Sequence, residues 1–231
     1  MNILITGASR GLGLALADES LKRGHSVIAA VRSPEHGGKL AELRERYGAN
    51  VETAMFDVTD ETAIARFAAG YAARGKRLEA IINNAAILTE RGSSIEELDM
   101  TEVARTFDVN VLGPMRVVKH LLPLMDGTGG VIVNISSEAG SLHGAYGGDY
   151  AYGTSKTALN MFTEQLKHAV KPRGIAVYAV HPGWMKTDMG GSEAPGDPRT
   201  SASGILDLIE RRTAPSRRFS FVDYSGSAMD I

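Results

Sequence analysis

Short apolar runs that alternate with helix-length segments are the feature of this sequence that most limits its fold. The runs lie at residues 3–6, 27–31, 51–56, 78–83, 131–136, 175–180 and 219–222. Helix-length connections join parallel strands, and apolar runs without alternation indicate strands that are covered on both faces. The sequence therefore predicts a three-layer, doubly wound α/β sheet of about seven parallel strands, with helices on both faces.

The segments between these runs have the apolar spacing of helices. Helices are expected at residues 12–23, 39–47, 61–73, 95–125, 152–170 and 203–211. The longest of them is expected to kink or split at Gly113-Pro114, because proline lacks the N–H that a helix interior needs. Residues 188–200 hold Gly, Pro, Ser and Asp and are expected to form a loop. We find no repeat or linker, so residues 1–231 are expected to form a single domain.

Composition and charge exclude several classes of protein. The chain contains no cysteine, which excludes disulfides, thiolate nucleophiles and thiolate-bound metals. A net charge of -2 gives no field that would attract nucleic acid or a membrane surface. Residues 1–6 do not resemble a signal peptide, and no apolar run approaches the ~18 residues of a membrane span. These observations predict a cytoplasmic protein without a nucleic-acid, membrane or metal partner.

The first apolar run leads into a glycine-rich turn, Thr6-Gly7-Ala8-Ser9-Arg10-Gly11-Leu12-Gly13, and a helix follows. The three glycines allow a tight turn and a close approach of the backbone to a ligand. The helix N-terminus offers N–H groups and a positive dipole end to a pyrophosphate. A turn without a ligand is the alternative, but the position directly after the first strand favours a dinucleotide site. The residues expected to contact the dinucleotide here are Gly7, Ser9, Arg10, Gly11, Leu12 and Gly13.

The end of the second run indicates which dinucleotide is bound. When the cofactor is NAD, an acid is expected about twenty residues beyond the turn, where it binds the ribose 2′-hydroxyl. This sequence has Arg32 there, and a guanidinium can bind a 2′-phosphate through two hydrogen bonds. Arg10, within the turn, adds a second positive charge. Two solvated surface arginines are the alternative, but their joint placement favours NADP(H).

Further motifs follow the later runs in a fixed order. They are Asp57, Asn83-Asn84-Ala85, Asn110, Asn134-Ile135-Ser136-Ser137, Tyr152-x-x-x-Lys156 and Pro182-Gly183. Together with the glycine turn, these motifs resemble the short-chain dehydrogenase/reductase family over nearly the whole chain. The resemblance implies a Rossmann-type sheet and an NADP(H)-dependent oxidoreductase. The segments most similar to the C-factor-like and sniffer-like carbonyl reductases are residues 150–161, 181–191 and 221–226.

The resemblance also implies which residues surround the ligands. Beyond the turn, the residues expected at the cofactor are Arg32, Asp57, Val58, Asn84, Ala85, Ala86, Tyr152, Lys156, Pro182, Gly183 and Thr187. The residues expected at the substrate are Ser137, Trp184, Met185 and Met189. For the last three, ordinary packing is an equal alternative. Ala86 stands where the family usually has glycine, and its added methyl group is expected to be tolerated.

The chemistry of carbonyl reduction favours Tyr152 and Lys156 as the proton-handling pair. The nicotinamide supplies the hydride, so the protein must orient the reactants and supply one proton. A phenol titrates near ~10, and a neighbouring ammonium is expected to lower that pKa. Lys156 lies four residues after Tyr152 and shares its helix face. Taken alone, such a pair is equally typical of an exposed helix.

Two further residues complete the expected catalytic set. Ser137 ends the fifth strand, where ligands of such sheets collect, and its hydroxyl can donate to the substrate oxygen. Ser136 is the competing choice, and the family pattern favours Ser137. The resemblance implies that Asn110 holds a water that feeds protons to Lys156, and a structural hydrogen bond to a local carbonyl is compatible with that role.

The expected activity is NADP(H)-dependent interconversion of a carbonyl compound and an alcohol by a homodimer or homotetramer. The alternative is a cofactor-binding regulatory or signalling protein with little turnover. A hydrolase that uses Ser137 ranks lower, because the sequence contains no Gly-x-Ser-x-Gly elbow. His143 and His181 have no partners at a spacing useful for metal binding or Ser-His catalysis, and both are interpreted as structural.

Overall fold

The predicted parallel sheet is confirmed. The computed structural model describes residues 1–33, 38–125, 129–213, 215 and 219–231. It contains the seven strands β1 (Asn2–Thr6), β2 (Ser26–Val31), β3 (Val51–Met55), β4 (Ala80–Asn83), β5 (Val131–Ile135), β6 (Ala176–His181) and β7 (Phe221–Asp223). Their order in the sheet is β3-β2-β1-β4-β5-β6-β7, and every neighbouring pair is parallel. Each strand lies within two residues of its predicted run, because these runs form the buried centre of the molecule.

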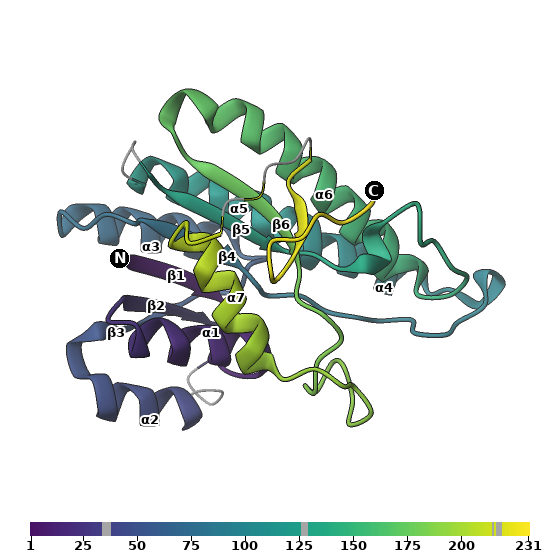
Figure 1. Cartoon of the computed structure of the whole chain (residues 1–231), viewed down its shortest axis with the longest axis horizontal. Coiled ribbons are helices and arrows are strands. Elements are labelled where there is room, and N and C mark those ends of the chain that lie inside the picture. Colours follow the sequence, from purple (N-terminus) through teal and green to yellow (C-terminus); the bar gives the residue numbers. More distant parts are fainter. Residues whose placement is uncertain (34–37, 126–128, 214, 216–218) are drawn as a thin grey trace.

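Helices cover both faces of the sheet (Figure 1). One face packs against α1 (Gly11–Lys22), α2 (Gly38–Tyr47) and α7 (Pro198–Ile209). The other packs against α3 (Glu61–Ala73), α5 (Gly113–Leu121) and α6 (Tyr150–Val170), and α4 (Met100–Phe107) lies against α6. The resulting three-layer arrangement is the one that the sequence predicts.

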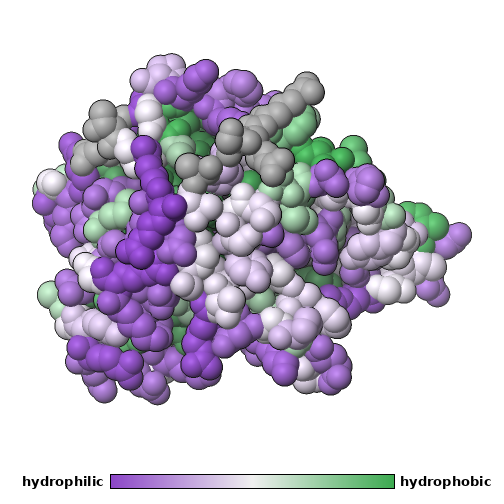
Figure 2. All heavy atoms as spheres, in the orientation of Figure 1, coloured by the Kyte–Doolittle hydropathy of each residue, from purple (hydrophilic) through white to green (hydrophobic). Residues whose placement is uncertain are grey.

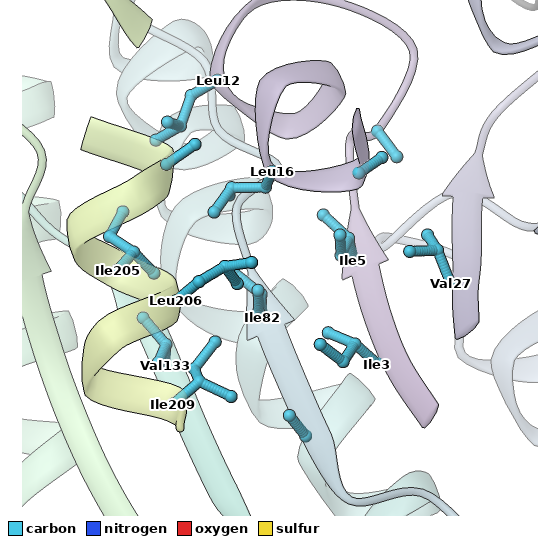
Figure 3. Close-up of a cluster of buried hydrophobic side chains, with 14 of the residues drawn as sticks. Ile3, Ile5, Leu12, Leu16, Val27, Ile82, Val133, Ile205, Leu206 and Ile209 are labelled. Carbon is cyan, nitrogen blue, oxygen red and sulfur yellow. The ribbon is translucent and has the colours of Figure 1, made fainter. Parts of the chain in front are cut away.

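The first of these faces has an aliphatic core between α1, α7 and the central strands. Figure 3 shows its side chains, which include Leu12, Leu16, Ile205, Leu206 and Ile209 from the helices and Ile3, Ile5, Ile82 and Val133 from the strands. All nine are nearly excluded from solvent. This core fixes the N-terminus of α1 against the carboxyl ends of the strands.

The order in which strands are added to the sheet reverses at the boundary between β1 and β4. It proceeds outward from β1 to β3, then returns to place β4 on the other side of β1. The connections that leave the carboxyl ends of β1 and β4 therefore diverge, and a crevice forms between them. Ligands of doubly wound sheets bind at such a switch point.

Two expected elements differ from their prediction. The helical region expected over 95–125, with a kink or split at Gly113-Pro114, is divided into α4, a π-helical stretch at Asp108–Leu112, and α5, which is followed by a short 3-10 turn. The interruption thus lies just before Gly113-Pro114. The loop expected at 188–200 ends early, because α7 begins at Pro198. Asp197 caps that helix by accepting a hydrogen bond from the Arg199 N–H at 2.9 Å.

The visible surface is largely hydrophilic, with hydrophobic side chains in small separate groups (Figure 2). Among the described residues, no helix has the length and apolar character required to cross a membrane.

Candidate active site

A cavity of about 630 Å³ lies at the carboxyl edge of the sheet, where the sequence places its candidate residues. Its walls come from the segments that follow β1 to β6. Nineteen of the candidates line it: Gly7, Ser9, Arg10, Gly11, Leu12, Arg32, Asp57, Val58, Asn84, Ala85, Ala86, Ser137, Tyr152, Lys156, Pro182, Trp184, Met185, Thr187 and Met189. The three that do not line it are Asn110, Gly13 and Gly183.

The glycine turn can hold a pyrophosphate only because these positions lack side chains. Gly7 and Gly11 have φ angles of 66° and 53°, which lie in the left-handed region. A Cβ atom on Gly13 would lie 2.2 Å from the Gly7 carbonyl oxygen. The N-cap of α1, Arg10, makes no side-chain capping bond, so the helix N-terminus faces the cavity uncapped. The structure therefore provides the cradle that a dinucleotide phosphate requires.

Asn84 ties the turn to the end of β4. Its Nδ2 donates to the Thr6 carbonyl oxygen at 2.9 Å, and the Thr6 hydroxyl oxygen accepts from the backbone N–H groups of Asn84 and Ala85, both at 3.0 Å. These bonds hold the ends of β1 and β4 together at the floor of the cavity. Ala86 follows without a positive φ angle, so the residue that replaces the family's glycine is not strained.

Both arginines expected at the 2′-phosphate line the cavity and face a carboxylate. Arg10 forms an ion pair with Asp188 at 2.7 Å, and the Arg32 Nε lies 4.0 Å from an Asp57 carboxylate oxygen. Asp57 is itself oriented by hydrogen bonds from the backbone and hydroxyl of Thr59, at 2.9 and 2.8 Å. The end of the cavity next to the glycine turn therefore holds two guanidinium groups, at the ends of β1 and β2.

Tyr152 and Lys156 extend from the first turns of α6 towards the end of β5. The Lys156 Nζ lies 5.3 Å from the centre of the Tyr152 ring and donates to the Ile135 carbonyl oxygen at 2.7 Å. Lys156 is almost completely buried. The Ser137 side chain lines the cavity beside them and acts to lower the pKa of the Tyr152 phenol. The three side chains thus meet at one point of the cavity.

The electrostatics of this pair differ from the prediction. Burial raises the pKa of Tyr152 to about 12, although the Ser137 side chain and the charge of Arg91 act in the opposite direction. Burial also lowers the pKa of Lys156 to about 7. The predicted lowering of the phenol pKa by an ammonium group is not observed, because desolvation outweighs every charge near Tyr152 and removes much of the charge on Lys156 at neutral pH.

The two competing serines occupy different environments. Ser136 is buried, and its hydroxyl donates to the Asn160 Oδ1 at 2.6 Å. Ser137 lines the cavity, and its hydroxyl oxygen accepts from the Ala139 N–H at 3.2 Å, which leaves the hydroxyl proton free to donate. The hydrogen bond of Ser136 holds β5 against α6, whereas Ser137 is available to a ligand.

Asn110 lies behind the cavity, buried in the π-helical stretch. Its Oδ1 accepts from the Ile87 N–H, and its Nδ2 donates to the Ile87 carbonyl oxygen, both at 2.9 Å. It also donates to the Ser155 hydroxyl at 3.1 Å. Asn110 therefore connects the loop after β4 to Ser155 of α6, the residue that precedes Lys156.

The two histidines occupy different environments. His181 lines the cavity, and its Nδ1 accepts from the Glu138 backbone N–H at 3.1 Å. Burial lowers the pKa of His181. His143 is exposed, and no group of acids and histidines suited to a metal ion occurs among residues 1–33, 38–125, 129–213, 215 and 219–231.

The cavity residues that the sequence reasoning missed include Arg91, Tyr146 and Asp149. The Tyr146 hydroxyl donates to Asp149 at 3.2 Å, and the Arg91 Nε lies 4.0 Å from the other Asp149 oxygen. The position of Arg91 after the fourth strand was the available signal, since ligands collect at the carboxyl ends of strands. Tyr146 and Asp149 lie in the glycine-containing segment between Ser137 and Tyr152, which the sequence places beside the substrate without singling out either residue.

Comparison with known proteins decides the family. The family model of short chain dehydrogenases matches residues 1–197. The chain belongs to the short chain dehydrogenase family. It is 36% identical to the C-signal of Myxococcus xanthus over 152 residues, which cover 65% of this chain and 90% of that protein.

Solved short-chain dehydrogenases share the complete architecture. The structure of the carbonyl reductase Sniffer of D. melanogaster has a TM-score of 0.92 and 32% identity, with coverage of 100% of this chain and 99% of that one. The NADPH-bound carbonyl reductase from chicken fatty liver has a TM-score of 0.87 and 29% identity, with coverage of 100% and 98%. The predicted resemblance to the C-factor-like and sniffer-like members of the family is confirmed, and the chain is a dehydrogenase/reductase.

Proposed function

We propose that this short-chain dehydrogenase is an NADP(H)-dependent carbonyl reductase that interconverts aldehydes or ketones with alcohols. One observation carries the proposal: Ser137, Tyr152 and Lys156 meet in the same cavity that the glycine turn lines. A dinucleotide held by that turn would share the cavity with these three side chains. A single domain, a homodimer or homotetramer and a cytoplasmic location stay predictions.

The bound nicotinamide supplies the hydride for this reaction. Tyr152 donates a proton to the substrate oxygen, and a pKa of about 12 keeps the phenol protonated at neutral pH until it does so. Ser137 donates a hydrogen bond to the same oxygen as negative charge develops on it. Lys156 has a pKa of about 7, close to the operating pH, and this value suits it to exchange protons after each turnover.

The preference for NADP(H) rests on Arg10 and Arg32. The end of β2 carries Arg32 in place of an acid, and both guanidinium groups line the cavity. Their carboxylate partners are exposed or distant, so a phosphate can replace them. The NADPH-bound carbonyl reductase with 29% identity supports the same cofactor.

The decisive experiment follows NADPH oxidation by absorbance with a panel of aldehydes and ketones. Tyr152→Phe is expected to lose at least about a hundredfold in kcat, the usual contribution of a positioned acid. Tyr150→Phe is the matched control, because Tyr150 lies on the same helix but does not line the cavity. Full activity of Tyr152→Phe, or tighter binding of NADH than of NADPH, would contradict the proposal.

The similarity to C-signal favours one second candidate, a signalling protein that binds the cofactor with little turnover. The same experiment separates the two. Binding of NADPH without oxidation by any carbonyl compound in the panel would support the signalling role.

A further inference from the structure

Arg91 is a cation of the cavity with no assigned role. It lies in the loop between β4 and α4 and shares the lining with Ser137 and Tyr152. Its side chain is 56% exposed, and its nearest charged partner, Asp149, is 4.0 Å from Nε. The charge of Arg91 acts to lower the pKa of Tyr152, so the guanidinium lies near the reacting end of the cavity.

The loop that carries Arg91 is fixed by contacts on both sides of it. The backbone of Ile87 is bonded to Asn110 through both its N–H and its carbonyl oxygen. The Thr89 hydroxyl bonds to that of buried Thr106 at 2.7 Å. Glu90 has a φ angle of 54°, and its carboxylate accepts from the Asp99 N–H at 3.1 Å. Arg91 is therefore held at the cavity by an anchored backbone.

Asp149 is the charged partner of Arg91 and is mostly buried. Its backbone is left-handed, with φ 49° and ψ 30°, a conformation that costs a residue with a side chain about 1 kcal/mol or more. One carboxylate oxygen accepts from the Tyr146 hydroxyl, and the other is shielded from solvent without a hydrogen-bond partner in the described residues. Only 15% of the Asp149 side chain is exposed. The charge presented to a ligand here is therefore positive.

The other charged groups that line the cavity have partners or lie at its margins. Arg105 binds both carboxylate oxygens of Glu102 at 3.3 Å. Glu138 is 66% exposed and faces His181, and Asp188 pairs with Arg10. In contrast, the Arg91 side chain is 56% exposed and lies no closer than 4.0 Å to its charged partner, and a guanidinium fork matches the two oxygens of a carboxylate.

We propose that Arg91 binds an anionic group on the substrate, so that the preferred substrates are aldehydes or ketones that carry a carboxylate or a similar anion. This inference rests on the proposed reductase function. It assigns Arg91 as the residue that selects the substrate by charge, while Tyr152 and Ser137 act on the carbonyl group.

The test compares ω-oxo carboxylates of increasing chain length with their methyl esters, which have the same aldehyde but no charge. At the best chain length we expect kcat/KM for the acid to exceed that for the ester at least about tenfold, the worth of a charge-assisted hydrogen bond. In Arg91→Gln this ratio falls towards one, and in Arg91→Glu it falls below one because the charges repel. Arg105→Gln, the matched control, keeps the wild-type ratio.

Two outcomes would overturn the inference while leaving the reductase function intact. The first is equal kcat/KM for acid and ester at every chain length. The second is an equal loss for acid and ester in Arg91→Gln with no change in their ratio, which would show a structural effect. NADPH binding to each variant establishes that it is folded. If no ester and no acid oxidises NADPH, the proposed function itself fails.

Discussion

At the scale of single residues, the buried position of Lys156 destabilises the folded protein. It is 2% exposed, and its recorded hydrogen bond is to a neutral acceptor, the Ile135 carbonyl oxygen. Burial lowers its pKa to about 7 from a usual value of 10.5. Keeping an ionisable amine in such a place destabilises the folded state and is typical of functional sites.

Lys156→Met is therefore expected to be more stable than the wild type at pH 7, by at least about 1 kcal/mol, and inactive. The folded protein binds fewer protons than the unfolded chain between pH 7 and 10.5, so wild-type stability rises with pH in this window. The stability advantage of Lys156→Met over the wild type therefore shrinks as the pH rises from 7 to 10.5. Urea unfolding at both ends of the window measures this, and a variant less stable than the wild type at pH 7 would contradict the argument.

At the scale of elements, the N-terminus of α1 depends on its closeness to the preceding turn. Gly13 lies within this helix, yet its Cα faces the Gly7 carbonyl oxygen rather than solvent. Gly70 lies within α3 and has no atom within 4 Å of the position of a Cβ. Both glycines therefore lie within helices, but the space for a side chain is filled at Gly13 and open at Gly70.

Alanine at these two positions should have opposite effects. Gly13→Ala is expected to lower stability by more than about 1 kcal/mol and to weaken NADPH binding, because its methyl group would overlap backbone atoms 2.2 Å away. Gly70→Ala should raise stability by about 0.5–1 kcal/mol, since alanine is the better helix former. Thermal unfolding and fluorescence titration with NADPH check both. Equal effects of the two changes would be inconsistent with the packing described.

The elements also show where sequence reasoning ends. The glycine turn, the seven strands and the helix of Tyr152 follow from local patterns, because apolar runs and glycine positions report burial and backbone conformation directly. The π-helical stretch does not, since it accompanies a hydrogen bond between Asn110 and Ile87, 23 residues apart. Arg91 was missed for a similar reason: the position of its loop depends on contacts with residues that are farther along the sequence.

The early start of α7 was a different kind of error. Asp197 and Pro198 are an N-cap and a first-turn proline, so the signal was present in the sequence and was read as part of a loop. The pKa values of Tyr152 and Lys156 could not be predicted, because they depend on burial that only the assembled sheet and helices determine.

At the scale of the whole molecule, an ion-pair network joins the beginning of the chain to its last helix. Arg23, at the end of α1, donates to Glu19, Asp207 and Glu210 at 2.7–2.9 Å and to Ser203. His25 binds the other Glu210 oxygen at 2.8 Å. The Arg23 side chain is 14% exposed, so these charges interact with little screening.

Arg23→Ala is expected to cost about 3 kcal/mol, because it leaves the Asp207 carboxylate without its partner and removes one of the cations around Glu210, which keeps His25 and Arg212. Lys22→Ala removes a neighbouring but exposed pair with Asp18 and should cost no more than about 0.5 kcal/mol. Differential scanning calorimetry distinguishes a drop of roughly 6–12 °C in Tm for the first change from almost none for the second. Equal melting temperatures would mean that the network adds nothing to the packing of α1 against α7.

The ion pair between Arg10 and Asp188 has a consequence for the environment in which the enzyme works. Both side chains are more than half exposed, at 66% and 71%, so the pair contributes at most about 1 kcal/mol and yields readily to a phosphate. Added salt screens exposed charges, whereas the reacting groups on α6 are buried. Ionic strength therefore acts on the choice of coenzyme and hardly on the chemistry: the advantage of NADPH over NADH narrows as salt rises, while turnover with saturating coenzyme stays constant.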